Sequence, residues 1–409
     1  MQYDVFFSIC QTPVEGVCPS EPEMFRSFFR QVQAADQAGY GVAWVAEAHL
    51  STQIQKRHSA PVVPHWQGEI GLNTDIFQLA HRVFAVTKNI AVGSAVMNLM
   101  CNGGPVARAE QIATFLTLHG LDPSERRRLC VGFSAGRFDF MNRAYGVQPR
   151  SPLEAAAWPA LKGLAFAEAA EIFLRLLRGE VLSSDDVRAT TLSRADFRSD
   201  ADWERVRPLG GGGDTVTVPR RFSFEPLQII PRDWRRDLLE LYVGSHAPWL
   251  QDELNRLYPV RVFNLSITAP AIIDETHARM AQRFHPDGGA WTRGHMPRTV
   301  MVFLNEQPGL SPESRRAAAR AEAKTALNAY WSAMEGTLDP RKVAEATDNA
   351  VVGNADDVAE QIAARFHPED RLMLWFDFFN HDCDRIIANQ DAFMEKVAPR
   401  VASRVGGAA

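Results

Sequence analysis

Residues 128–146 read Arg128-Leu-Cys-Val-Gly132-Phe-Ser-Ala-Gly136-Arg-Phe-Asp-Phe-Met-Asn142-Arg-Ala-Tyr-Gly146. A short apolar run here leads into a loop that glycines punctuate, which is typical of a strand that ends in a tight turn. In parallel α/β folds, ligands bind at such carboxyl ends of strands. The stretch therefore predicts a parallel α/β fold with a ligand site beyond this strand.

Apolar runs alternate with segments of helical period along the rest of the chain. Strands are predicted at residues 3–9, 42–46, 90–97, 129–133, 239–243, 261–267, 299–304 and 372–376. Helices are predicted at residues 21–38, 74–86, 105–118, 153–177, 249–257, 271–284, 312–334 and 355–366. This alternation favours a (β/α)8 barrel, and a doubly wound open sheet with a helical lobe is the alternative.

A single barrel domain is expected over residues 1–409, with one interruption. Residues 183–221 are polar, rich in Arg and Asp, and contain the run Gly210-Gly-Gly-Gly213. A long irregular insertion of this kind is either a lid over the ligand site or a surface excursion.

Composition sets limits on function. The chain is 46% hydrophobic and 23% charged with a net charge of -5, so nothing favours binding to nucleic acid or an anionic membrane. The N-terminus does not resemble a secretory signal, and no apolar run approaches the roughly 20 residues of a membrane span. Five scattered cysteines without Cys-x-x-Cys spacing indicate reduced thiols in a cytoplasmic protein, and no residue set has metal-ligand spacing.

The segment Ala34-Ala-Asp-Gln-Ala-Gly-Tyr-Gly-Val-Ala-Trp-Val-Ala-Glu-Ala-His49 resembles the first helix and second strand of the bacterial luciferase-like monooxygenases. Members of that family are flavin-dependent barrels, and this strand commonly ends in Glu-His-His. Here the strand ends in Glu47-Ala48-His49, so Ala48 replaces the histidine that is tied to catalysis in the luciferases. The resemblance implies Glu47 and His49 as the catalytic candidates, which would orient or exchange protons at the flavin.

The segment Ile90-Ala-Val-Gly-Ser-Ala-Val-Met-Asn98 is similar to the third strand of the same family. In that strand a non-proline cis peptide lies against the flavin ring, and Ala95-Val96 is the matching pair. Asn98 and Cys101 follow the strand at the mouth of the predicted barrel, where they are candidate substrate contacts.

The opening stretch resembles the glycine loop of the family, with two departures. Ser134 stands where the luciferases have a reactive Cys, and Ala135 stands where they have an Arg. Arg137, two positions later, is the expected substitute for that Arg as a phosphate ligand.

Residues 241–249, Leu241-Tyr-Val-Gly244-Ser245-His246-Ala-Pro-Trp249, look like the phosphate loop of the family. An apolar strand here meets Gly-Ser-His, and a helix begins near Pro248, so free N–H groups can face a phosphate. The cofactor-binding residues implied together are Ala95, Val96, Ser134, Gly136, Arg137, Phe138, Gly244, Ser245, His246 and Trp249.

The resemblance implies a two-component monooxygenase. Reduced FMN would come from a separate flavin reductase, O2 would be the co-substrate, and a small hydrophobic or carrier-tethered organic molecule would be oxygenated by a homodimeric enzyme. An F420-dependent hydride-transfer oxidoreductase is the first alternative. A non-catalytic subunit of a luciferase-like heterodimer is the second, favoured by Ala48 and Ala135, and a flavin-independent barrel is the third.

Overall fold

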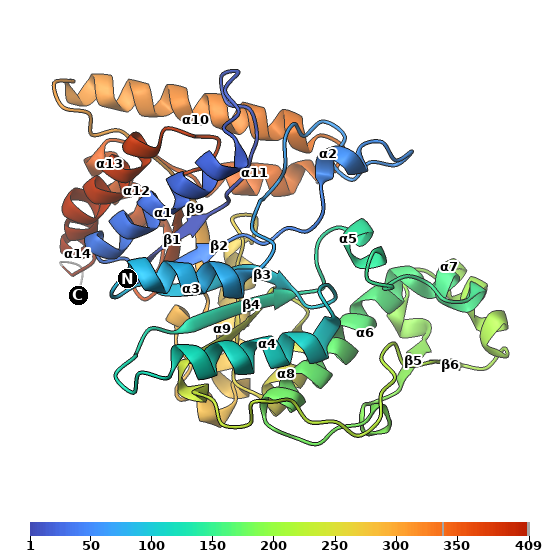
Figure 1. Cartoon of the computed structure of the whole chain (residues 1–409). Coiled ribbons are helices and arrows are strands. Elements are labelled where there is room, and N and C mark those ends of the chain that lie inside the picture. The colour runs from blue at the N-terminus through green and yellow to red at the C-terminus, as the bar shows by residue number, and fades with distance from the viewer. Residues whose placement is uncertain (338, 407–409) are drawn as a thin grey trace.

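Parallel strands form the centre of the molecule (Figure 1). The computed structural model describes residues 1–337 and 339–406. One nine-stranded sheet has the order β10-β9-β11-β1-β2-β3-β4-β7-β8. Its strands are β1 (Gln2–Phe7), β2 (Val42–Val45), β3 (Ala91–Asn98), β4 (Leu129–Ser134), β7 (Leu239–Val243), β8 (Val260–Val262), β9 (Arg298–Leu304), β10 (Val351–Gly353) and β11 (Arg371–Trp375).

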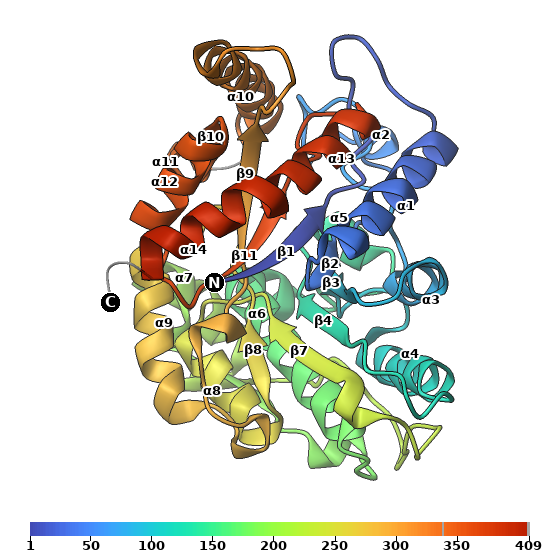
Figure 2. The same ribbon diagram turned by 90° about the vertical axis from the view of Figure 1, so that its left-hand side faces the viewer.

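The sheet closes on itself between β8 and β9. Asn264 forms a parallel bridge with Arg298, in which the Asn264 N–H donates to the Pro297 carbonyl at 3.0 Å and the Thr299 N–H donates to the Asn264 carbonyl at 3.1 Å. Because β10 only extends the edge of β9, the other strands form the ring that Figure 2 shows. The predicted (β/α)8 barrel is confirmed.

Helices surround this ring (Figure 2). They are α1 (Glu21–Ala38), α2 (Thr52–Gln55), α3 (Ile76–Val86), α4 (Gly104–His119), α5 (Asp139–Arg143), α6 (Pro152–Leu177), α7 (Asp200–Val206), α8 (Pro248–Leu257), α9 (Pro270–Arg283), α10 (Pro312–Met334), α11 (Pro340–Asp348), α12 (Ala355–Arg365), α13 (Cys383–Ala392) and α14 (Ala398–Gly406). Local signals set several ends: Ser20 and Glu23 form a capping box at α1, and Gly39 ends that helix with a φ of 90°.

One predicted strand is too long. The apolar pattern predicts a strand over 261–267, but β8 ends at Val262. Asn264 then leaves the neighbouring β7 to bridge β9, and Leu265 is exposed. The apolar pattern continues past the last residue of β8 that is hydrogen-bonded in the sheet. The pattern alone therefore could not show where β8 ends.

The insertion 183–221 is ordered, and the expectation of an irregular segment is wrong. It contains the antiparallel pair β5 (Thr190–Ser193) and β6 (Thr215–Val218) and the helix α7. Trp203, Val206 and Val216 belong to an apolar cluster that packs against the N-terminal half of α6. This core, which the insertion shares with α6, gives the insertion a fixed attachment beside α5 (Figure 1).

The barrel interior is filled with side chains and is charged at its N-terminal end. Phe6, Trp44 and Tyr242 are among the apolar side chains that fill it. Beneath them Asp4 pairs with Arg371 at 2.6 Å and accepts the indole N–H of Trp44 at 2.7 Å. The open mouth of the barrel is therefore at the opposite, carboxyl end of the strands.

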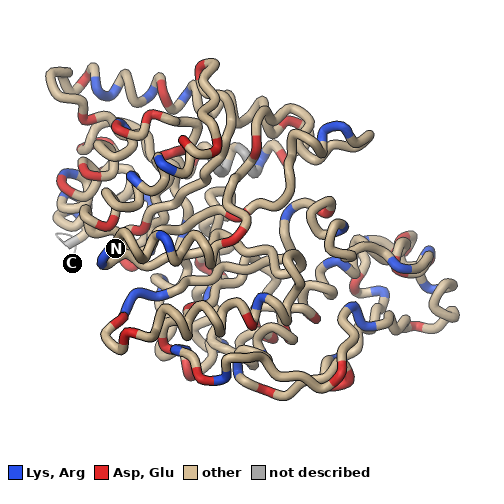
Figure 3. The backbone as a smooth tube through the Cα atoms, in the orientation of Figure 1, with Lys and Arg blue, Asp and Glu red and all other residues tan. Residues whose placement is uncertain are grey.

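Charges of both signs are interspersed along the backbone in Figure 3. Among the described helices, none has both the length and the apolar character that crossing a bilayer requires.

Gly93 provides a test of the packing inside the barrel. A Cβ at this position would lie 2.4 Å from the fully buried Trp44 ring, so Gly93→Ala should lower the free energy of unfolding by about 1–3 kcal/mol. A Cβ added to Gly163, on the exposed side of α6, would meet no atom within 4 Å, so Gly163→Ala is the control and should stabilise the protein by up to about 1 kcal/mol. Urea denaturation measures both, and equal effects would refute the crowding at Trp44.

Candidate functional site

Apolar side chains form the floor of the barrel mouth. Phe6, Ala46, Val96 and Trp375 come from four neighbouring strands or strand ends and belong to one cluster, in which the last three remain partly exposed. The rings of Phe6 and Trp375 meet edge to face with centroids 4.8 Å apart. This floor can hold a flat apolar ring system and keep water away from it.

The strand that carries the floor residue Val96 is irregular. The Ala95–Val96 peptide is cis, as the family resemblance predicted, and the pairing of β3 with β4 shifts between Ser94 and Met97. Gly132 on β4 makes room for this arrangement, because a Cβ there would lie 2.4 Å from the Ser94 carbonyl oxygen and 2.7 Å from Val96 Cγ1.

Three predicted cofactor residues lie close together at the mouth. A Cβ on Gly244 would lie 3.3 Å from Ser134 Cβ and 3.5 Å from Val96 Cγ2. The Gly244 N–H donates to the Phe133 carbonyl at 2.9 Å, which holds the end of β7 beside β4. Residues from three different strands thus converge on one patch of the mouth.

The turn from β7 into α8 has the features of an anion site. The N-cap residue of α8, Ala247, offers no side-chain cap, and Pro248 begins the helix. The Ser245 carbonyl accepts the side-chain N–H of Gln251 at 2.6 Å, while its hydroxyl accepts the Ala247 N–H at 3.4 Å. His246 Nε2 lies 3.3 Å from the Thr268 hydroxyl, and Trp249 is 48% exposed. Helix N-termini of this kind attract phosphate groups.

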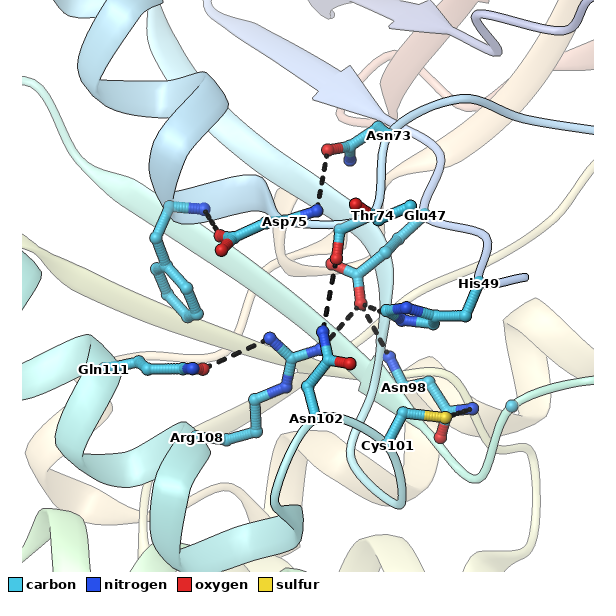
Figure 4. Close-up of polar contacts among 12 residues, drawn as sticks. Glu47, His49, Asn73, Thr74, Asp75, Asn98, Cys101, Asn102, Arg108 and Gln111 are labelled. Atoms are coloured by element: carbon cyan, nitrogen blue, oxygen red, sulfur yellow. Dashed lines mark hydrogen bonds and ion pairs between the residues drawn. The ribbon is translucent and has the colours of Figure 1, made fainter. Parts of the chain in front are cut away.

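A buried carboxylate ties together the ends of β2 and β3 (Figure 4). Glu47 Oε1 accepts hydrogen bonds from Arg108 Nη2 at 3.0 Å and from the Asn98 N–H at 3.3 Å, and it lies 2.9 Å from His49 Nε2. The side chains of Glu47 and Arg108 have no exposed surface. Glu47 therefore acts on the mouth through the groups that it holds in place.

His49 is the predicted catalytic residue that this carboxylate orients. An ionised Glu47 accepts a hydrogen bond, so His49 Nε2 carries the proton and Nδ1 remains the acceptor. No described side chain bonds to His49 Nδ1. The ring is 3% exposed, and Ala48 beside it packs against Cys101 and Met141.

Sequence reasoning missed Arg108, the partner of Glu47. A signal was present, since Arg108 falls on the same helical face as the buried residues Pro105, Ala109 and Ile112 of α4. A charged residue on an apolar face requires a buried partner, and the partner lies 61 positions earlier in the chain.

The two predicted substrate contacts form an internal network instead of lining open space. Asn98 Nδ2 donates to Asn142 Oδ1 at 2.8 Å and to Cys101 Sγ at 2.9 Å, and Asn142 donates to the Ala135 carbonyl at 2.9 Å. Burial raises the pKa of the Cys101 thiol to about 12, so the thiol stays protonated. Substrate contact by Asn98 and Cys101 stays a prediction, and what the structure shows is their support of the glycine loop.

Gly136 lets the glycine loop cross the mouth. Its φ is 72°, and a Cβ there would lie 2.2 Å from Asn98 Nδ2. Beyond it, the guanidinium of Arg137 lies over the ring of Phe138, 5.1 Å from the centroid, and Phe138 packs against the apolar cluster that includes Trp66 and Met334. The Ser245 backbone and hydroxyl contact Gln251 of α8 and Ala247 of the turn into that helix.

A second acid at the mouth was also missed. Asp377 follows β11 and accepts hydrogen bonds from the Ser8 N–H at 3.1 Å and the Ser8 hydroxyl at 3.2 Å. Burial raises the pKa of Asp377 to about 6, although these hydrogen bonds oppose the shift. The carboxyl borders a cavity of about 250 Å³ between β1 and α1. Within the described ranges, no three His, Cys, Asp or Glu residues gather as metal ligands.

Comparisons with known proteins agree with the fold. The family described as luciferase-like monooxygenase matches residues 1–201. The monooxygenase RslO1 from Streptomyces bottropensis is similar in structure, with a TM-score of 0.65 and 17% identity over 98% of this chain and 99% of that one. Curated proteins give no match.

Two further solved structures are similar to this chain in fold. The oxygenating constituent of 3,6-diketocamphane monooxygenase from Pseudomonas putida, in complex with FMN, has a TM-score of 0.57 and 14% identity over 98% of this chain and 99% of that one. An F420-dependent secondary alcohol dehydrogenase has a TM-score of 0.53 and 16% identity over 98% of both chains. At these identities the structures share the fold, and the resemblance predicted from the sequence is confirmed.

The buried pair of Glu47 and Arg108 can be tested by a double-mutant cycle. Arg108→Met leaves the carboxylate buried without its cation and should lower the free energy of unfolding by about 3–5 kcal/mol. Glu47→Gln in the same chain removes the orphaned charge and should restore at least part of that loss. Urea denaturation of the single and double variants measures the coupling. Losses that simply add would show that the two side chains do not depend on each other.

The raised pKa of Asp377 predicts a pH dependence of stability. The folded carboxyl titrates at about 6 and an unfolded Asp at about 3.9, so between these values the folded state binds more protons and loses stability as pH rises. Relative to Asp377→Asn, the parent protein should lose up to about 3 kcal/mol between pH 4 and 7. Denaturation of both proteins across this range measures the difference. A difference that is independent of pH would show that Asp377 titrates normally.

Proposed function

We propose that this chain, whose residues 1–201 match the luciferase-like monooxygenase family, is a flavin-dependent monooxygenase that uses reduced FMN and O2 to oxygenate a small organic substrate. The observation that carries this proposal is the convergence of Val96, Ser134 and Gly244 beside the N-terminus of α8. An apolar surface and an anion site thus lie next to each other at the mouth.

The residues present fit the two ends of reduced FMN. The floor formed by Phe6, Val96 and Trp375 suits an apolar ring face. The phosphate would be held by Ser245, by His246 and by the N–H groups of α8. When bound, reduced FMN supplies the electrons that activate O2.

The side chains of this chain have three tasks in such a reaction. The apolar floor excludes water from the reacting centre. Glu47 holds the His49 ring in one tautomer, so Nδ1 is the atom that can hold or move a proton. Arg108 donates to Glu47 Oε1 and holds that carboxyl group in place, which makes Arg108 a positioning residue.

The proposal includes partners that the resemblance implies. A separate reductase would supply the reduced FMN, and the similarity to a protein described as an oxygenating constituent supports such a division. We further propose that the protein is a homodimer and that it is located in the cytoplasm. The ordered insertion 183–221 would act as a wall or lid, since it lies at the same end of the molecule as α5 (Figure 1).

An anaerobic titration tests the cofactor. Reduced FMN should quench the tryptophan fluorescence, and Ser245→Asp should weaken its binding by about tenfold or more, because a carboxylate would face the phosphate. Reduced riboflavin lacks the phosphate and should bind both proteins alike. Ser403→Asp, on the exposed surface of α14, is the matched control.

Each other outcome has a definite meaning. If F420H2 binds and reduced FMN does not, the chain is an F420-dependent oxidoreductase, the class to which one similar structure belongs. If neither binds, the monooxygenase proposal fails and a non-catalytic subunit takes its place.

A further inference from the structure

The cavity of about 250 Å³ between β1 and α1 lies outside the ring of strands that Figure 2 shows. On one of its walls the Phe7 ring of β1 meets the Phe28 ring of α1 edge to face, with centroids 5.1 Å apart. The neighbouring Phe6 belongs instead to the cluster that fills the barrel interior. The residues that line this cavity are different from those proposed to hold reduced FMN, so the cavity is separate from the barrel mouth.

Bonds between segments far apart in the sequence hold the walls of this cavity together. His381 Nε2 lies 2.6 Å from the Thr12 carbonyl oxygen, and the Cys383 thiol donates to the Ser27 carbonyl at 3.7 Å. The cavity is thus bounded by the end of β1, by α1 and by the segment between β11 and α13. Glu23 lines the cavity and is itself exposed, so the cavity reaches the surface of the molecule.

A buried amide oxygen in the wall has no partner. Gln31 of α1 lines the cavity and is 4% exposed. Its Nε2 donates to the Ser27 hydroxyl at 3.2 Å, whereas its Oε1 accepts no hydrogen bond from the described residues. Because a buried acceptor without a donor is costly, a ligand that brings an N–H or O–H group would complete this site.

The carboxyl groups give the cavity a negative character. Asp377 accepts hydrogen bonds only from neutral donors, including the N–H and hydroxyl of Ser8, and in the described part of the chain no Lys or Arg pairs with it. Burial without a cation raises the pKa of this carboxyl to about 6. At the rim, hydrogen bonds from Ser20 lower the pKa of Glu23, so that second carboxyl stays ionised. A cation that enters the cavity therefore meets acceptors that lack one.

The remaining walls are apolar and leave room for an organic body. Phe7, Ile9, Met24 and Phe28 line the cavity. Its volume exceeds the roughly 150 Å³ of a cavity that holds benzene in another protein. Aromatic faces also attract cations. Such walls suit an organic cation better than a metal ion, which requires several ligand side chains around it.

We propose that this cavity is a second ligand site, separate from the barrel mouth, that binds a small protonated amine with a compact apolar body. The ammonium group has three N–H donors, for which the Asp377 carboxylate and Gln31 Oε1 are the acceptors in the wall. The apolar body lies against Phe7, Met24 and Phe28. The proposal goes beyond the reaction at the mouth and does not depend on it.

A matched pair of ligands tests this assignment. The full chain is titrated in a calorimeter with benzylamine and with benzyl alcohol, which have the same ring and differ in the charge. At about pH 8 the amine is protonated and Asp377 is ionised, since the pKa of Asp377 is about 6. The parent protein should bind benzylamine about tenfold more tightly than benzyl alcohol.

Two substitutions in the wall should change this preference. Asp377→Asn removes the charge at nearly constant volume and should bind the two ligands about equally. Gln31→Leu removes the unpartnered oxygen and should weaken benzylamine binding by about tenfold, because a hydrogen bond from a charged donor is lost. Asp384→Asn is the matched control, since this exposed carboxylate of α13 lies outside the lining and its loss should leave the preference unchanged.

The outcomes separate this inference from the proposed function. No binding of benzylamine, no preference for it, or a preference that Asp377→Asn keeps overturns the inference even if reduced FMN binds. Displacement of benzylamine by reduced FMN also overturns it, because the amine would then occupy the mouth. A preference that depends on Asp377 supports the inference even where reduced FMN fails to bind, and in that case only the proposed reaction falls. Circular dichroism shows whether each variant keeps the fold, and Asp377→Asn alone decides if Gln31→Leu does not.

Discussion

One carboxylate oxygen, Glu47 Oε1, holds the barrel mouth in its observed form. It accepts the Arg108 guanidinium, lies against the His49 ring and receives the N–H of Asn98, so the ends of two strands and a helix share a single acceptor. A carboxylate without exposed surface is stable only when such partners are present. Asn98 in turn fixes the position of the glycine loop, because its carboxamide donates a hydrogen bond to Asn142 and packs over Gly136.

The two ends of the barrel have opposite chemistry, and this contrast confines a ligand to one of them. At the N-terminal end, Asp4 pairs with Arg371, and Glu240 pairs with Arg261 and accepts the Tyr242 hydroxyl. Burial of charges demands that they be matched, and these ion pairs match them. At the carboxyl end the partly exposed groups are apolar, and the polar donors stand at the rim.

Features that depend on interactions between residues close in the sequence could be predicted. Features that depend on residues far apart in the sequence could not. The bounds of α1 and α10 were predicted from caps and prolines within a few residues of each end, as were most strands from their apolar runs. The partners of Glu47 and Asp377 lie 61 and 369 positions away, so only the closed barrel brings them together. The strands β5 and β6 and the helix α7 of the insertion were not predicted, because their apolar residues are few. Those residues face a core that the insertion shares with α6.

The departures from the family pattern in the glycine loop have a geometric consequence. An Arg at the position of Ala135 would follow β4 directly and stand beside Ser134 and Gly244. Gly136 intervenes before Arg137, and its φ of 72° turns the chain away from the strand and across Asn98. A shift of two positions therefore carries the positive charge beyond Gly136, where the guanidinium lies over the Phe138 ring.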